Sequence, residues 1–287
     1  MRVGSVLLMV VALAGLMQRG PAWAEIVTLK MPNGLTARAD YRKGDPAKPA
    51  VLILHGFLLT HEFSTVQRLS DGLHGEGYTV LAPTLTLGVP HRRQSLACEA
   101  IHKHSLQDDF RELEAWIRWL GERHRRSIVI IGHSQGSTAL TLFLDGQPNP
   151  RIGKLIGVSI VEVNASQDAR RNREIEAEVR QRLARGERGL VTLPLSYCKR
   201  YVATPETYLS YQEWSPERII EAIKRLKTPY ALVMGGGDER VGPKWIQRLE
   251  GTGKTVHVIP GANHFLDGMH EFDLLDAVLQ EMKAVRP

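Results

Sequence analysis

The sequence predicts an α/β fold in which a mostly parallel central sheet carries helices on both faces. Short runs of apolar, mostly β-branched residues recur along the chain without alternating polar residues, as expected of strands buried on both faces. Amphipathic segments of helical period separate most of these runs, and such alternation is typical of parallel sheets with crossover helices. The runs are 50–54, 78–82 (closed by Pro83), 128–131, 155–161, 230–234 and 255–259.

The regions between and around these runs complete the expected order of elements. Residues 25–40 contain two short strand-like runs around an Asn33-Gly34 turn, which predicts an antiparallel hairpin at the sheet edge. Helices are expected near 66–74, 106–120, 137–144, 216–226, 245–249 and 272–285. Segment 190–214 is rich in aromatic residues but shows no clear period.

The first 24 residues have the pattern of a secretory signal peptide. Arg2 precedes an apolar core over 3–17, and Ala22-Trp23-Ala24 offers a small-residue cleavage site. The core is shorter than the roughly 20 residues of a membrane-spanning helix, so we expect cleavage rather than an uncleaved anchor, and no stable membrane anchor afterwards. The protein is then exported, to the periplasm or the medium if the source is bacterial.

Residues 25–287 are expected to form a single domain. The chain of 287 residues with 43% hydrophobic content can bury one large core. The charged segment 164–188 carries a narrow apolar stripe, Ile175, Val179 and Leu183, which predicts a surface helix laid over another element. We therefore expect a small helical cap inserted at about 164–228.

The charge balance gives no indication of a nucleic-acid partner. The formal net charge is +6, and it falls to +4 when Arg2 and Arg19 leave with the leader. An excess this small, without a run of like charges, does not make the basic surface that nucleic acids require.

The two cysteines, Cys98 and Cys198, lie in segments expected above the same edge of the sheet. In an oxidising compartment they could form a disulfide or remain as two buried thiols. A bridge closing so long a loop would stabilise the fold by about 4–5 kcal/mol in the chain-entropy model.

His102 and His104 lie near Cys98, but their spacing fits no common zinc site. We expect no metal and no cofactor.

The most informative stretch is Gly132-His133-Ser134-Gln135-Gly136, between a predicted buried strand and a predicted helix. A strand, a sharp turn and a helix with serine at the apex is the context in which G-x-S-x-G marks a nucleophile elbow. The glycines let the strand and the helix approach closely. The turn exposes the Ser134 hydroxyl and directs the Gln135 N–H toward a developing oxyanion.

A second oxyanion donor is expected after strand 50–54, where His55-Gly56-Phe57 follows. In this architecture the second N–H comes from a loop after an early strand, and Phe57 N–H is the candidate. His55 is expected to form hydrogen bonds rather than to catalyse. Leu58, Leu59 and the tyrosines of 197–211 could line an apolar acyl site, although core packing would explain them equally well.

Three side chains at three predicted strand ends complete the set: Ser134, Asp238 and His264. A serine needs a neighbouring base, histidine has a suitable pKa, and a carboxylate orients the imidazole. Asp238 is the expected acid, with Glu239 and Glu162 as alternatives. The order Ser, Asp, His is that of α/β-hydrolases.

On the His55-Gly56 pair, the 132–136 motif, Gly237-Asp238 and the 261–264 segment, residues 50–287 resemble an α/β-hydrolase-fold serine hydrolase of the esterase and lipase type. The resemblance implies cleavage of a small carboxylic ester through an acyl-serine. Thioester, amide or C–C bonds could be cleaved by the same groups, and a binding protein that has lost turnover could keep the fold.

Overall fold

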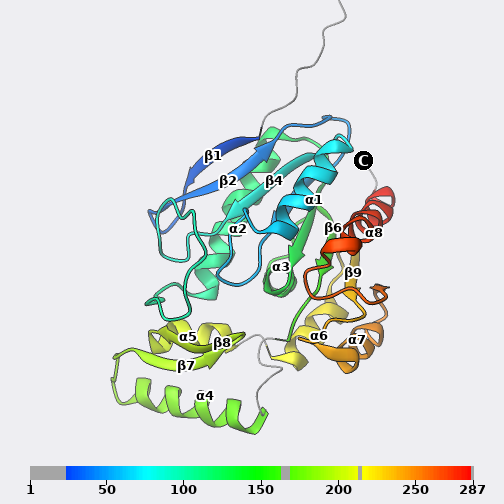
Figure 1. Cartoon of the computed structure of the whole chain (residues 1–287). Helices are drawn as coiled ribbons and strands as arrows, with labels where there is room; N and C mark the ends of the chain where they lie inside the picture. The colour runs from blue at the N-terminus through cyan, green and yellow to red at the C-terminus, as the bar shows by residue number, and fades with distance from the viewer. Residues whose placement is uncertain (1–23, 163–168, 213–214, 286–287) are drawn as a thin grey trace, which may run out of the picture.

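The computed structural model describes residues 24–162, 169–212 and 215–285 of the chain, and its centre is an eight-stranded sheet (Figure 1). In spatial order the strands are β1 (Glu25–Lys30), β2 (Thr36–Arg42), β4 (Thr79–Thr84), β3 (Ala50–Leu54), β5 (Ile128–His133), β6 (Ile152–Val158), β9 (Tyr230–Gly235) and β10 (Thr255–Ile259). The first two strands form the expected antiparallel hairpin, and β4 to β10 run parallel. The predicted α/β class is confirmed.

Helices cover both faces of the sheet because the buried strands present alternate residues to opposite sides. One face packs on α1 (Ser64–Gly75) and α8 (Glu271–Lys283). The other face packs on α2 (Leu106–Arg123), α3 (Gln135–Gly146), α6 (Pro216–Arg225) and α7 (Gly242–Glu250). In β3, for example, Val51 and Ile53 belong to the first core, whereas Leu52 and Leu54 belong to the second.

A separate layer lies at one end of the molecule (Figure 1). It consists of α4 (Ala169–Ala184), the two-stranded sheet of β7 (Val191–Leu195) and β8 (Cys198–Ala203), and α5 (Pro205–Tyr211). We call these elements the cap. The region in which a helical cap insertion was predicted, about 164–228, contains a β-hairpin as well as helices, and its last described helix, α6, packs against α3.

Strands β5 and β9 extend one or two residues beyond the expected runs, and the boundaries of β4 and β6 differ for local reasons. Strand β4 continues through Pro83 to Thr84, because β3 pairs with it only as far as Leu81 and Pro83 is opposite a strand on one side only, at Ala39 of β2. A proline is tolerated where one edge of the strand needs no N–H donor. Strand β6 covers Ile152–Val158 rather than 155–161, and the chain turns at Ser159, where φ is +48°.

Of the two alternatives for the cysteines, the structure has the Cys98–Cys198 disulfide, which joins residues 100 positions apart. It links the loop before α2 to the beginning of β8. The expected signal peptide, 1–24, lies almost entirely outside the described residues. In the part of the chain that the structure describes, no helix is long and apolar enough to cross a membrane.

The turn from β5 into α3 is the most crowded point of the fold. A Cβ atom on Gly132 would lie 2.4 Å from the Ser137 nitrogen, and one on Gly136 would lie 2.4 Å from the His55 carbonyl oxygen. Both neighbours are backbone atoms, which cannot move aside as a side chain can. Ser134, at the apex, takes φ +56° and ψ −125°, a conformation that L-residues adopt only when the surroundings enforce it.

We expect Gly136→Ala to lower the free energy of unfolding by about 2–3 kcal/mol or more, since the new methyl group must displace backbone. The matched control is Gly146→Ala at the other end of α3, where a Cβ meets nothing within 4 Å. That change should leave stability unchanged or raise it by up to about 1 kcal/mol. Urea unfolding followed by circular dichroism measures both, and equal effects of the two substitutions would contradict the crowding described here.

Candidate active site

Ser134, Asp238 and His264 lie together at the carboxyl edge of the sheet, after β5, β9 and β10. The Nε2 atom of His264 is 2.9 Å from the Ser134 hydroxyl oxygen, and its Nδ1 atom is 2.7 Å from Asp238 Oδ2. The other Asp238 oxygen accepts a hydrogen bond from the Arg240 N–H at 2.9 Å. Asp238 and His264 are each only 3% exposed. The three side chains therefore form one chain of hydrogen bonds that is shielded from water on its acidic side.

The two alternative acids lie elsewhere. Glu162 is 3.9 Å from the guanidinium of Arg248, and burial raises the pKa of its carboxyl group. Glu239 is exposed, and among the hydrogen bonds of the described residues it accepts none from His264. Of the three candidates, Asp238 is the carboxylate that contacts the imidazole.

A second histidine, His133, forms a hydrogen bond to the main chain of the loop that carries His264. The His133 ring, fully buried, lies 3.3 Å from the His264 carbonyl oxygen through Nε2, and it stacks on Phe63 with ring centroids 5.6 Å apart. Burial, reinforced by the nearby His264, lowers the pKa of His133 to about 3. His133 is therefore neutral near pH 7, and its Nε2–H donates to the carbonyl oxygen. Nothing in the sequence pattern distinguishes His133 from the other residues of the motif.

The two expected oxyanion donors flank Ser134. Gln135 is the first residue of α3, so its N–H lacks an intrahelical acceptor and lies at the positive end of the helix dipole. The Gly56-Phe57 segment approaches from β3, and a Cβ on Gly56 would lie 3.4 Å from the Ser134 Cβ. A side chain at position 56 would therefore narrow the space in which a substrate carbonyl must sit.

We call residues 56–59 the oxyanion loop, and its four consecutive carbonyl groups all accept hydrogen bonds. The donors are His55 Nδ1 and Leu59 N–H to Gly56 (2.7 and 3.2 Å), Tyr197 OH to Phe57 (3.0 Å), Leu96 N–H and Arg92 Nη1 to Leu58 (3.0 and 3.2 Å), and Arg92 Nη2 to Leu59 (2.7 Å). Each bond fixes the plane of one peptide group. The direction of the Phe57 N–H is consequently set before a substrate arrives, which is the condition for strong transition-state stabilisation.

Arg92 is the residue of this network that sequence reasoning missed. It is 3% exposed, and besides the oxyanion loop its guanidinium binds the carbonyl of Leu85 through Nε at 2.8 Å. Burial lowers the pKa of Arg92 to about 10, so it remains a cation at neutral pH. In the sequence it is one of several basic residues in an irregular stretch, and no spacing distinguishes it from His91 or Arg93.

His55 has the hydrogen-bonding position expected for it. Burial, together with the charge of Arg92, lowers its pKa to about 3. In the neutral ring Nδ1–H donates to the Gly56 carbonyl, and Nε2 accepts from the Leu85 N–H at 3.2 Å. His55 thus joins the oxyanion loop to the end of β4.

A small cavity of about 30 Å³ lies beside the two expected donors. Its walls are mostly apolar and include Leu58, Leu85, Leu87 and Ala139. One wall is Asp109, whose Oδ2 accepts a hydrogen bond from the Tyr211 hydroxyl at 2.5 Å. Burial raises the pKa of Asp109 well above its usual range.

The histidines near Cys98 do not form a metal centre with it, because its sulfur is bonded to Cys198. His102 stacks on Tyr201 with ring centroids 4.3 Å apart. Among the residues that the structure describes, no group of three or more histidine, cysteine, aspartate or glutamate side chains could hold a metal ion.

The low pKa of His133 makes stability depend on pH. In the unfolded chain this histidine is protonated below about pH 6.5, whereas in the fold it stays neutral to about pH 3. The unfolded state then binds more protons, so the free energy of unfolding falls as pH decreases through this window. We expect the loss between pH 7 and pH 5 to be about 2 kcal/mol smaller in His133→Asn than in the wild type. Urea titrations at both pH values measure this difference, and an equal loss in both proteins would contradict the assignment.

Comparisons with known proteins identify the fold and the family of the chain. The profile of the Alpha/beta hydrolase family matches residues 51–275. Curated protein sequences give no match. Among solved structures, the alpha/beta hydrolase GrgF from Penicillium sp. sh18 is similar, with a TM-score of 0.67 and 15% identity over 90% of this chain and 97% of that one.

Two further structures have the same fold at comparable identity. Est1E from Butyrivibrio proteoclasticus has a TM-score of 0.63 and 17% identity over 90% of this chain and 99% of its own. The thioesterase domain from the curacin biosynthetic pathway has a TM-score of 0.58 and 20% identity over 91% and 99%. The strand order, with two edge strands ahead of a parallel sheet, and the serine elbow are consistent with this match. Because the family profile covers most of the length, the chain belongs to the alpha/beta hydrolase family.

Proposed function

We propose that this protein is a serine hydrolase that cleaves a carboxylic ester through an acyl-serine intermediate. The observation that carries the proposal is the continuous hydrogen-bond chain from Ser134 through His264 to Asp238, at 2.9 and 2.7 Å. These distances allow direct proton transfer from the hydroxyl to the imidazole. A serine hydroxyl needs such a base to attack a carbonyl at neutral pH.

The reaction proceeds in two halves. His264 Nε2 accepts the Ser134 proton while the serine oxygen bonds to the substrate carbonyl carbon, and the carbonyl oxygen becomes an oxyanion. The imidazolium then gives its proton to the leaving alcohol as the C–O bond breaks, which leaves the acyl-serine. A water molecule repeats the sequence and releases the acid. Asp238 holds the ring with Nδ1–H directed toward it and stabilises the imidazolium.

The oxyanion is stabilised by the N–H groups of Gln135 and Phe57. The N-terminal end of α3 adds its dipole, and Arg92 adds a buried positive charge behind the oxyanion loop. Because the carbonyl groups of the loop are already bonded, little reorganisation accompanies formation of the negative charge. Removing one such donor in a serine hydrolase typically lowers the rate by about 10²- to 10³-fold.

Two features favour a short, uncharged acyl group. The cavity beside the donors is about 30 Å³ and mostly apolar, and burial raises the pKa of Asp109 in its wall well above the usual range of a carboxyl group. Esterases and a thioesterase are among the structurally similar proteins, so a thioester is the second candidate substrate. Amide and C–C substrates would use the same side chains.

The disulfide and the expected leader support a site of action in the periplasm or outside the cell.

The test is hydrolysis of p-nitrophenyl acetate by purified single-residue variants. Ser134→Ala and His264→Ala should each lower kcat by about 10⁴-fold or more, and Asp238→Asn by about 10³- to 10⁴-fold. Glu162→Gln and Glu239→Gln are the matched controls, since both remove an acid near the site without touching His264. They should keep kcat within about twofold of the wild type.

Covalent labelling separates an enzyme from a binding protein of the same fold. A fluorophosphonate should modify the folded wild type at Ser134 and leave Ser134→Ala unmodified. Absence of labelling in the folded wild type, or a substantial residual rate in Ser134→Ala or His264→Ala, would overturn the proposed function.

A further inference from the structure

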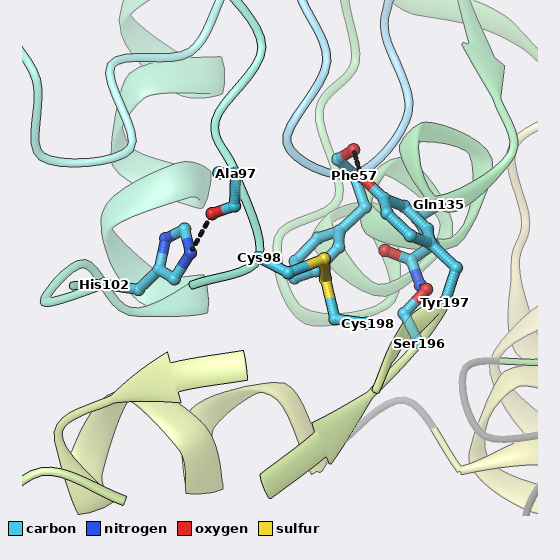
Figure 2. Close-up of a disulfide and its surroundings, with 8 residues drawn as sticks. All are labelled: Phe57, Ala97, Cys98, His102, Gln135, Ser196, Tyr197 and Cys198. Atoms are coloured by element: carbon cyan, nitrogen blue, oxygen red, sulfur yellow. Dashed lines mark hydrogen bonds between the residues drawn. A yellow bond between two sulfur atoms is a disulfide. The ribbon is translucent and has the colours of Figure 1, made fainter. Parts of the chain in front are cut away.

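The tip of the cap hairpin contacts both residues that carry the expected oxyanion donors (Figure 2). We call Ser196 and Tyr197, the two residues between β7 and β8, the hairpin tip. The Tyr197 hydroxyl donates to the Phe57 carbonyl at 3.0 Å, and the Ser196 hydroxyl oxygen accepts a hydrogen bond from the Gln135 side-chain amide. A segment remote in sequence thus touches the oxyanion hole from two sides.

The Tyr197 contact selects one orientation of a peptide group. Residues 56–59 form a turn closed by the Leu59 N–H to Gly56 carbonyl bond at 3.2 Å, with φ +58° at Leu58. A positive φ at the third position is the mark of a type II turn, which normally has glycine there. The Phe57–Leu58 peptide is flipped relative to a type I turn, and its carbonyl points to Tyr197. The tyrosine therefore stabilises a strained turn whose Phe57 N–H is the expected donor.

The Phe57 side chain is held by the cap as well. Its ring lies 6.0 Å from the Tyr197 ring, 5.6 Å from the Tyr201 ring and 5.7 Å from the Tyr211 ring, measured between centroids. These contacts involve rings only, so they survive when the Tyr197 hydroxyl alone is removed. The hydroxyl contact and the ring packing can consequently be separated by experiment.

The disulfide attaches the hairpin at the residue next to its tip. Cys198 directly follows Tyr197 and is bonded to Cys98 (Figure 2). Main-chain hydrogen bonds join the other end of β8 to the same loop, from His102 N–H to the Val202 carbonyl and from Thr204 N–H to the His102 carbonyl. Without the bridge, the far end of the strand would stay attached while the tip could move.

We propose that Ser196 and Tyr197 are positioning residues for the oxyanion hole, and that the Cys98–Cys198 bridge holds them in place. The proposal rests on the proposed function, because it assigns the cap a part in the same reaction. An oxyanion forms in both acylation and deacylation, so misplacing the hole lowers kcat and leaves the ground-state binding of a small ester nearly unchanged.

The first test is Tyr197→Phe, which removes one hydroxyl and keeps the ring. We expect kcat for p-nitrophenyl acetate to fall about five- to tenfold with KM within twofold. The matched control is Tyr230→Phe, which removes a buried hydroxyl that is hydrogen-bonded to the Thr141 hydroxyl at 2.8 Å and lies outside the cap and the oxyanion loop. It should keep both constants within twofold.

The second test is the bridge. Cys98→Ala/Cys198→Ala should lower kcat by a similar factor at a temperature where the variant is folded. If the bridge acts through the hairpin tip, the two changes share one effect, so adding the cysteine substitutions to Tyr197→Phe should cost much less than in the wild type. Full additivity would overturn the role of the bridge.

Two outcomes distinguish failure of the positioning role from failure of the proposed hydrolase function. If the wild type shows no turnover and no Ser134 labelling, the proposed function fails; hydrogen exchange then still tests the coupling, because loss of the Tyr197 hydroxyl should speed exchange of the Leu59 amide. If the wild type is active and Tyr197→Phe lowers the melting temperature while kcat stays unchanged, the hairpin is only structural and the positioning role is overturned. Unchanged Leu59 exchange would overturn it as well.

Discussion

The close approach of β5 and α3 is the constraint on which the rest of the site depends. Backbone atoms occupy the space where side chains at Gly132 and Gly136 would be, so the chain must turn within two residues and Ser134 must take a strained conformation. This turn brings the serine hydroxyl and the Gln135 N–H to the same side of the sheet. The oxyanion loop, the His264 loop and the hairpin tip all lie around the Ser134 hydroxyl, whose position is set by the elbow.

Backbone strain recurs in the segments that surround this point. Non-glycine residues with positive φ occur in the oxyanion loop, at the elbow, at the hairpin tip and after His264; they are Leu58, Ser134, Ser196 and Leu266. Each such residue costs of order 1 kcal/mol or more unless its surroundings offset it. Hydrogen bonds to neighbouring carbonyl groups supply that offset at Leu58, where Arg92 and the Leu96 N–H bind the same oxygen. The strain is thus distributed over contacts that also define the geometry of the site.

Local patterns predicted most of the fold because the relevant forces were local. Uninterrupted apolar runs marked the central strands, and the Asn33-Gly34 turn marked the first hairpin. The hairpin of β7 and β8 was not predicted, because its two-residue turn is Ser196-Tyr197, with φ +55° at serine where glycine is normally found. The approach of Ser134, Asp238 and His264 followed from strand order. Arg92 could not be predicted, since its partners are main-chain carbonyl groups that have no sequence signature.

Burial controls the charge of the polar groups around the oxyanion loop. It lowers the pKa of His55 and of His133 to about 3, so both rings are neutral near pH 7, whereas Arg92 remains a buried cation. A neutral ring can donate from one nitrogen and accept at the other, as His55 does between Gly56 and Leu85, so these groups position the backbone without adding negative charge near a developing oxyanion. Arg92 adds a positive charge to this network, at the carbonyl groups of Leu58 and Leu59. For the proposed acyl transfer, an environment built this way would favour the transition state over the ground state, because its dipoles are oriented before the reaction begins.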